Sequence, residues 1–224
     1  VLAERDCRRL RAAHQMHPPP RPPRRAVLLD HRLVVLERVH LGEAVVADVP
    51  PPTYFPKLRE ICDKHGVLLI ADEVITGFGR TGKWFALGHW GIEPDLVSFA
   101  KGVTSGYLPL GGVLVSDKVH AAIEAAPADE KFMHAATYSG HPACCAVGLA
   151  NIDIIEKEGL VERAAEVGPR FIAGLETLLS HPNVGEVRGL GMMAAVELVE
   201  DKGSRKPAIG MGGRVVAEAA KRGL

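Results

Sequence analysis

Two ionisable residues, each at the end of a short apolar run, are the first candidates for chemistry in this chain. Asp72 closes the run at residues 67–72, and Lys101 closes the run at residues 95–101. Apolar runs of this length predict buried strands. A charge at the end of such a strand must be paired or exposed in a crevice, because burying it alone is costly. In open α/β sheets, ligands bind in the crevice at the carboxyl ends of parallel strands. The pair therefore marks the predicted site.

A lysine and a carboxylate at one sheet edge have the chemistry that pyridoxal phosphate requires. A lysine desolvated at a strand end loses part of its preference for the charged form, and its neutral amine can attack a carbonyl to form a Schiff base. The cofactor also needs a carboxylate that keeps its pyridine nitrogen protonated. On residue types alone, however, a structural ion pair between Asp72 and Lys101 is the commoner interpretation.

The elements around this pair predict an α/β fold with a largely parallel sheet. Apolar residues follow helical spacing from Tyr54 to Cys62, and Gly66 is a plausible C-cap. Strands alternate with helices or long crossings, which is typical of a parallel sheet. The predicted strands are residues 67–71, 95–100 and 113–115, with a glycine-rich turn at 77–82 and a long loop at 102–112.

The second half of the chain predicts long helices followed by a small α+β unit. One helix begins after Pro142, and a second carries an apolar stripe from Leu160 to Leu178 that we expect to break or bend near Gly168-Pro169. Further predicted elements are strands at 184–187 and 193–199, joined by residues 188–191, and a last helix near 210–222. These patterns divide the chain into an irregular arm at 1–45, a partial large domain at 46–159 and a partial C-terminal small domain at 160–224.

Composition and charge argue for a local site rather than a charged surface. The chain has 224 residues, of which 47% are hydrophobic and 24% charged, and its 27 basic residues balance 27 acidic ones. No overall field therefore favours nucleic acid or an acidic membrane surface. The cysteines form no disulfide framework, and no apolar stretch is long enough to span a membrane or resembles a signal peptide. We expect a cytoplasmic protein. No metal-binding motif stands out among the ten histidines.

The first 45 residues differ in composition from the rest. They are rich in arginine and proline, and the first lysine of the chain is Lys57. The proline-rich run at 18–25 predicts a polyproline-like linker or an unstructured arm, which could alternatively bind an SH3-like partner or a polyanion. The composition also resembles a GC-rich gene read out of frame.

The sequence around the pair resembles a known family. Residues 69–82 read LIADEVITGFGRTG, residues 94–95 read PD, and residues 98–102 read SFAKG. From about Pro50 to Leu224 the chain resembles class III pyridoxal-phosphate-dependent aminotransferases, which have the aspartate-aminotransferase-like fold (fold type I). The loop at 104–112 resembles the version in ω-amino acid and amine:pyruvate transaminases. The implied reaction moves an amino group from an ω-amino acid or amine to a keto acid such as pyruvate.

The resemblance implies roles for individual residues at the cofactor. Asp72 corresponds to the carboxylate that pairs with the pyridine nitrogen, and Val74 to the apolar side chain against one ring face. Lys101 corresponds to the Schiff-base lysine, which also moves the proton as general base and acid. Thr137 matches the threonine that hydrogen-bonds the cofactor phosphate of the neighbouring subunit, which implies a homodimer with its active site at the interface. Without the family, Thr137 would be a turn residue ahead of a helix.

Two further residues are candidates for substrate binding. Arg188 resembles a small-domain arginine that pairs with a substrate carboxylate in several family members, although a structural ion pair is an equal alternative. Trp84 follows the glycine-rich turn and could instead cover a core edge. Arg80, in the same turn, is more plausibly structural.

The family comparison also predicts what this chain lacks. Members are much longer, and their upstream phosphate-binding loop and the aromatic residue that stacks on the other ring face have no counterpart here. We therefore expect a truncated chain. The alternatives to an aminotransferase are an inactive truncated remnant of such an enzyme, and an aminomutase or decarboxylase of the same family.

Overall fold

The computed structural model describes four ranges of the chain: residues 33–35, 48–129, 132–134 and 136–224. Most of the predicted arm at 1–45 therefore lies outside the described residues. The part that is described, residues 33–35, is a short strand rather than irregular chain. It falls in the apolar run LVVL at residues 33–36, whose signal is easily missed beside so many arginines and prolines.

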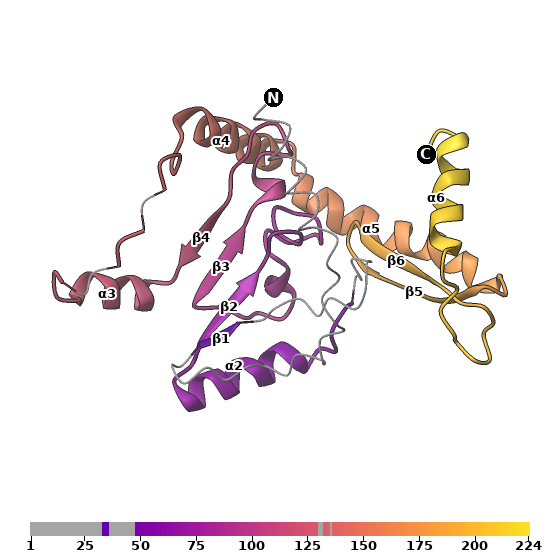
Figure 1. Ribbon diagram of the computed structural model, residues 1–224, viewed down its shortest axis with the longest axis horizontal. Coiled ribbons are helices and arrows are strands. Elements are labelled where there is room, and N and C mark those ends of the chain that lie inside the picture. The colour runs from indigo at the N-terminus through magenta and orange to yellow at the C-terminus, as the bar shows by residue number, and fades with distance from the viewer. Residues whose placement is uncertain (1–32, 36–47, 130–131, 135) are drawn as a thin grey trace, which may run out of the picture.

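The larger sheet has four strands in the order β1-β2-β3-β4 (Figure 1). Strands β1, β2 and β3 are parallel, as expected, whereas β4 is antiparallel to β3. The direction reverses because the loop after β3 turns back at the end of that strand instead of crossing the sheet through a helix. The strands are β1 (Leu33–Val35), β2 (Leu68–Asp72), β3 (Leu96–Phe99) and β4 (Gly112–Val115).

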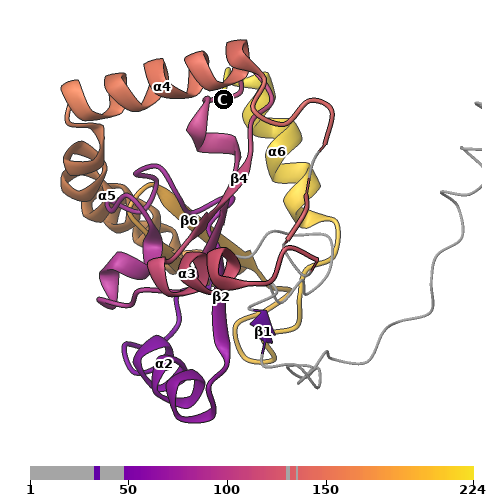
Figure 2. The same ribbon diagram turned by 90° about the vertical axis from the view of Figure 1, so that its left-hand side faces the viewer.

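Helices lie on either side of these strands, with α2 below them and α4 above them in both Figure 1 and Figure 2. The helices are α2 (Tyr54–His65), α3 (Asp117–Ala125), α4 (Pro142–Lys157), α5 (Leu160–Glu176) and α6 (Met211–Lys221), and the 3-10 helices are η1 (Ala86–His89), η2 (Lys101–Val103) and η3 (Thr177–Ser180). None of the helices within the described ranges is both long and apolar enough to cross a membrane.

Helix α2 packs on β2 and forms a small core with it. The buried residues are Cys62, Val67 and Leu69, and Leu58 packs against them. The predicted C-cap is confirmed, since Gly66 takes the left-handed conformation with φ of 62° and ends the helix. The chain can therefore turn directly from α2 into β2.

A buried carboxylate fixes the amino end of β3 against β2. Asp95 is 7% exposed, and its Oδ2 accepts hydrogen bonds from the Leu69 amide at 2.8 Å and from Arg59 Nη1 at 2.9 Å. Lys118 Nζ lies 3.7 Å from the other oxygen. Burial alone would raise the pKa of Asp95, but the Leu69 amide and the Arg59 guanidinium outweigh it, so the pKa lies below its ordinary value.

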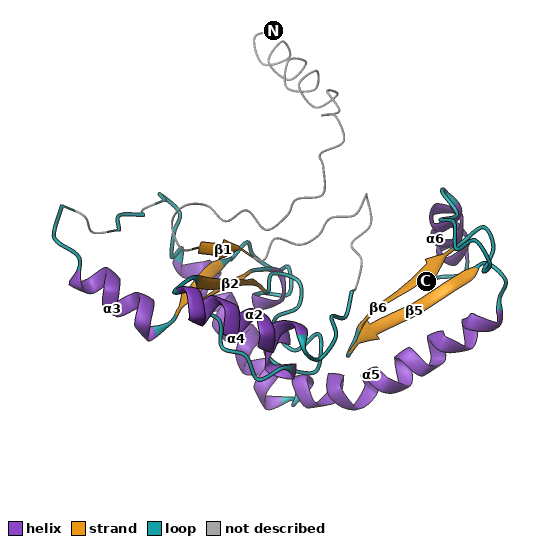
Figure 3. Cartoon of the chain, turned by 90° about the horizontal axis from the view of Figure 1, so that it is seen from below, coloured by secondary structure: helices purple, strands orange, loops and turns teal. Residues whose placement is uncertain are grey.

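The second sheet is a two-stranded hairpin that lies along α5 (Figure 3). Its strands are β5 (Val184–Leu190) and β6 (Met193–Leu198). Of the expected break or bend of α5 near Gly168-Pro169, the break is wrong, because the helix continues through both residues. Gly168 instead allows close packing: a Cβ there would lie 2.6 Å from the Gly191 Cα in the hairpin turn. The glycine thus marks a helix–hairpin contact and not a helix end.

Candidate active site

Asp72 ends β2 with its carboxylate exposed at the edge of the sheet. In the parallel ladder it lies opposite Ser98 of β3. Its Oδ1 accepts a hydrogen bond from the Val74 amide at 3.0 Å and one from Ser98 Oγ at 3.2 Å. Oδ2 has no hydrogen-bond partner within the described part of the chain. One oxygen therefore orients the carboxylate, and the other can accept a further donor.

Glu73 holds the same segment from the opposite face. It is 3% exposed, its Oε1 accepts from the Leu87 amide at 3.0 Å, and its Oε2 accepts from the Ala86 amide at 3.0 Å and from the Thr76 hydroxyl. Its own amide donates to the Ser98 carbonyl at 3.0 Å. Sequence analysis did not single out Glu73, although side-chain alternation along a strand places it opposite Asp72. It ties the end of β2 to η1.

Lys101 follows β3 by two residues and begins η2. Its backbone lies in the left-handed region with φ of 43°, which costs about 1–3 kcal/mol for a residue other than glycine. Its side chain is exposed and forms no hydrogen bond or ion pair with any described residue. Such strain is typical of functional sites.

The fold thus brings Asp72 and Lys101 to the carboxyl ends of two adjacent parallel strands. The structural ion pair between them, which was the commoner interpretation on residue types alone, does not form in the structure of the described residues. Both strands were expected to be buried. In β2 only alternate residues are buried, and all four residues of β3 are only half-buried. The neighbouring strand β4 leaves Val113, Leu114 and Val115 between 41% and 54% exposed, so both strands are incompletely covered.

The glycine-rich turn packs directly against the turn that begins at Lys101. A Cβ on Gly102 would lie 2.9 Å from the Phe78 Cβ and 3.3 Å from the Gly77 carbonyl oxygen. Val74, at the start of the turn, is half-buried. Trp84 is also half-buried, and its carbonyl accepts from the Phe78 amide at 2.7 Å. The side chain of Arg80 is exposed and forms no hydrogen bond or ion pair with a described residue, whereas its backbone carbonyl accepts a hydrogen bond from the Met192 amide at 2.8 Å.

Thr137 lies in the segment before α4 and forms no hydrogen bond with Asp72 or Lys101. It is exposed in a turn, as are the neighbouring residues that the structure describes. The predicted helix start at Pro142 is confirmed, with proline in the first helical position. The structure thus does not bring Thr137 together with Asp72 and Lys101 through any direct contact.

Arg188 lies within β5 and not in the expected loop, because the hairpin turn is shorter than predicted and Arg188 pairs with Ala195. Its side chain is 16% exposed and faces three carboxylates. Nη1 lies 2.9 Å from Glu197 and 3.8 Å from Glu186, and Nε lies 3.1 Å from Asp48. Nε forms no hydrogen bond with a described residue, so its contact with Asp48 is an ion pair without a hydrogen bond. This arrangement favours the structural ion pair.

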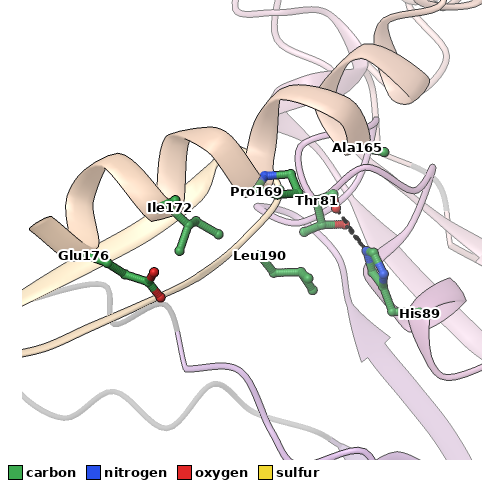
Figure 4. Close-up of a pocket in the computed structure, with 9 residues that line it drawn as sticks. Thr81, His89, Ala165, Pro169, Ile172, Glu176 and Leu190 are labelled. Carbon is green, nitrogen blue, oxygen red and sulfur yellow. Dashed lines mark hydrogen bonds between the residues drawn. The ribbon is translucent and has the colours of Figure 1, made fainter.

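A largely apolar cavity of about 450 Å³ lies elsewhere, between α5, the hairpin and the end of the glycine-rich turn (Figure 4). The polar residues that line it include Thr81, His89 and Glu176. His89 Nε2 lies 3.2 Å from the Thr81 hydroxyl. Neither Asp72 nor Lys101 lines it. Chemical groups and geometry therefore place the candidate site at the sheet edge and not in this cavity.

The residues at the sheet edge fit two of the groups on pyridoxal phosphate. The free Oδ2 of Asp72 can accept a hydrogen bond from a protonated pyridine nitrogen, and the exposed amine of Lys101 can reach an aldehyde. Val74 offers an apolar side chain beside Asp72. The donor set therefore suits the ring and the aldehyde of this cofactor.

Known proteins match the chain in both sequence and structure. The family described as Aminotransferase class-III matches residues 34–224, so the match begins before Pro50, where the resemblance was expected to start, and inside the arm predicted at 1–45. A putrescine–pyruvate aminotransferase of Pseudomonas aeruginosa is 50% identical over 159 residues, which are 70% of this chain and 34% of that protein.

Two solved transaminases have the same fold. An (S)-enantioselective ω-transaminase of Thermomicrobium roseum is 52% identical with a TM-score of 0.67, covering 70% of this chain and 35% of the other. A pyridoxal-phosphate-bound amine transaminase of an uncultivated Pseudomonas species is 48% identical with a TM-score of 0.75, covering 79% and 41%. The chain thus spans less than half the length of these relatives. It has the α/β fold of fold type I transaminases, and it belongs to the class III aminotransferase family.

Proposed function

We propose that this chain carries the cofactor-binding edge of a pyridoxal-phosphate-dependent aminotransferase. The reaction would move an amino group from an ω-amino acid or amine to a keto acid such as pyruvate. The observation that carries the proposal is the placement of Asp72 and Lys101 at adjacent strand ends, both exposed and without an ion pair to each other. The putrescine–pyruvate aminotransferase and the amine transaminase among its relatives support the choice of substrates.

Each proposed role uses an atom that the fold leaves available. When bound, pyridoxal phosphate supplies an aldehyde that accepts amino groups and a protonated ring that withdraws electrons. Asp72 Oδ2 would hold the proton at the pyridine nitrogen, while Oδ1 stays fixed by Val74 and Ser98. Lys101 Nζ would bind the aldehyde carbon and, once released, move a proton as base and then acid. Val74 would pack against the ring.

We further propose that the protein works as a homodimer in which Thr137 reaches the partner's cofactor phosphate. The segment around Thr137 exposes large apolar and aromatic side chains, with Phe132 72%, Met133 89% and Tyr138 82% exposed. Apolar surface of this kind suits a protein interface. The proposed domains, a partial large domain at 46–159 and a partial small domain at 160–224, would each contribute to such a dimer.

The substrate-binding roles of Trp84 and Arg188 stay predictions. Arg188 already faces Asp48, Glu186 and Glu197, so a substrate carboxylate would have to compete with three carboxylates for one guanidinium. A structural role for Arg188 is therefore the better supported of its two alternatives.

The proposed reaction can be tested by following product formation from two substrates. The 224-residue chain is incubated with pyridoxal phosphate, putrescine and pyruvate, and alanine is measured. We expect slow alanine formation, because the upstream phosphate-binding loop has no counterpart in this chain. Lys101→Ala should abolish it, whereas Lys57→Ala, at an exposed lysine of α2, should leave it unchanged. Equal activity in the wild type and Lys101→Ala would contradict the proposal. Loss of carbon dioxide from an amino acid, or migration of its amino group, would instead identify one of the other reactions in this family.

A further inference from the structure

The turn that begins with Lys101 is held by one side chain from α4. Asn151 Nδ2 donates hydrogen bonds to the carbonyl oxygens of Gly102 at 2.9 Å and Val103 at 3.2 Å. Asn151 Oδ1 accepts from Ser105 Oγ at 2.9 Å. Only the amide nitrogen can donate to two carbonyls while the amide oxygen accepts from a hydroxyl, so the contacts fix the orientation of the side chain.

These contacts fall on a segment whose backbone needs support. Lys101 and Ser105 both have positive φ, 43° and 51°, in the left-handed region that residues other than glycine rarely adopt. The two carbonyls held by Asn151 lie between these residues. A strained conformation persists only where the surroundings determine it, and Asn151 supplies three hydrogen bonds to this one segment.

Helix α4 approaches the segment closely enough for this contact to be rigid. Gly148 is one helical turn before Asn151, on the same face. A Cβ at Gly148 would lie 2.8 Å from Leu110 Cδ2 and 3.7 Å from Val103 Cγ2. The backbone of α4 thus packs against the loop after Lys101, and Asn151 hydrogen-bonds the same loop.

We infer that Asn151 is a positioning residue for Lys101, acting through the backbone of the 101–105 turn and not through the lysine amine. The inference rests on the proposed function, in which Lys101 binds the cofactor. Asn151 would hold the Lys101 backbone where its amine can reach the aldehyde while Asp72 reaches the ring. A displacement of a reacting group by about 1 Å can reduce the rate of its reaction strongly.

The chain supplies a matched control in Asn183. Its Nδ2 also donates to two successive carbonyl oxygens, those of Val199 at 3.1 Å and Glu200 at 3.0 Å. Both asparagines are half-buried. Asn183, however, joins the residues before β5 to those after β6 and is not in contact with η2. The same substitution at the two positions therefore separates loss of an asparagine contact from loss of Lys101 positioning.

The experiment compares Asn151→Asp with Asn183→Asp in the 224-residue chain. Aspartate places an oxygen where the amide donated, so it faces two carbonyl oxygens in either variant. We measure the thermal midpoint of unfolding, and we titrate pyridoxal phosphate by visible circular dichroism. Both variants should melt at lower temperature than the wild type, whereas only Asn151→Asp should bind the cofactor about tenfold more weakly.

A milder variant keeps the inference testable if Asn151→Asp does not fold. Ser105→Ala removes the hydroxyl that orients the Asn151 amide and should weaken cofactor binding about two- to threefold. Equal cofactor affinities for the wild type and Ser105→Ala would in that case overturn the inference.

The remaining outcomes separate this inference from the proposed function. If the wild type gives a cofactor signal, two results would overturn the positioning role of Asn151. One is an equal loss of cofactor affinity in Asn151→Asp and Asn183→Asp, and the other is wild-type cofactor affinity in Asn151→Asp. Absence of any cofactor signal in the wild type would overturn the proposed function, and the inference with it.

Discussion

Two aspartates at opposite ends of the β2–β3 pair show how one residue type takes two roles. Asp95 is 7% exposed, and its carboxylate contacts the Leu69 amide, Arg59 and Lys118. Asp72 is exposed, and one of its two oxygens has no partner in the described structure. A buried carboxylate whose oxygens are all paired stabilises the fold. An oriented carboxylate with one unpaired oxygen can instead bind a ligand. The difference supports the proposal that the end of the sheet at Asp72 carries the chemistry.

The largest effect that tests this difference is on stability. Asp95→Asn should lower the free energy of unfolding by about 2–3 kcal/mol, because it leaves the half-buried Arg59 without its main partner. Arg59 keeps its contact with Asp63 at 2.7 Å, which limits the loss. Asp72→Asn should change the same quantity by less than about 0.5 kcal/mol. Urea unfolding measures both, and equal losses would remove the distinction between the two ends.

A second prediction concerns backbone packing at the end that carries Asp72. Gly102→Ala would place a Cβ 2.9 Å from the Phe78 Cβ, so we expect a loss of about 1–3 kcal/mol and weaker cofactor binding. Gly174→Ala is the control, since the new Cβ would meet nothing within 4 Å. This substitution should stabilise α5 slightly, because alanine favours a helix more than glycine does. If Gly102→Ala unfolds and binds cofactor like the wild type, the close contact between the two turns has no consequence.

The third prediction is a pH dependence that belongs to Asp95. Because its pKa is lower in the folded than in the unfolded chain, its contribution to stability is complete above the unfolded value of about 3.9 and is lost as pH falls through the folded value. Asp95→Asn should therefore flatten the acid side of the stability curve, measured by urea unfolding below pH 5. An unchanged acid slope in the variant would assign this dependence to other groups.

The smallest effect concerns thiols near the buried end. Burial raises the pKa of the Cys62 thiol, which is fully buried beside Arg59. Cys144 and Cys145 are only half-buried. Among the three cysteines that the structure describes, a thiol reagent at neutral pH should therefore modify Cys144 and Cys145 before Cys62, as located by peptide mass mapping, and Cys62 only on unfolding. Early modification of Cys62 in the native protein would show that the core around Asp95 opens readily.

Local sequence patterns predicted much of the fold around the site. The helix ended by Gly66, the strands leading to Asp72 and Lys101, and the helix beginning at Pro142 all follow from periodicity and capping residues. Helix α3 was not predicted, although Ser116 caps it and Asp117 lies in its first turn. The direction of β4 and the length of the hairpin depend on long-range packing, which local patterns do not record.

The same limit applies within the candidate site. Asp72 and Lys101 could be identified from the sequence because each is a charged residue that ends a short apolar run. Glu73 and Asn151 were not, since the side-chain partners of Glu73 are up to 14 residues away and those of Asn151 are 46 to 49 residues away. Such contacts exist only once the elements have packed. The sequence therefore indicated the proposed reacting groups, and the structure added residues that hold the segments around them.

The most direct test of the functional end is to locate the covalently bound cofactor. The chain is incubated with pyridoxal phosphate, reduced with borohydride to fix the bond, digested and analysed by peptide mass spectrometry. We predict one modified lysine, Lys101, with the modification reduced in Asp72→Asn. Labelling spread over exposed lysines such as Lys57 and Lys83, with none favoured, would contradict the assignment of this sheet edge as the cofactor site.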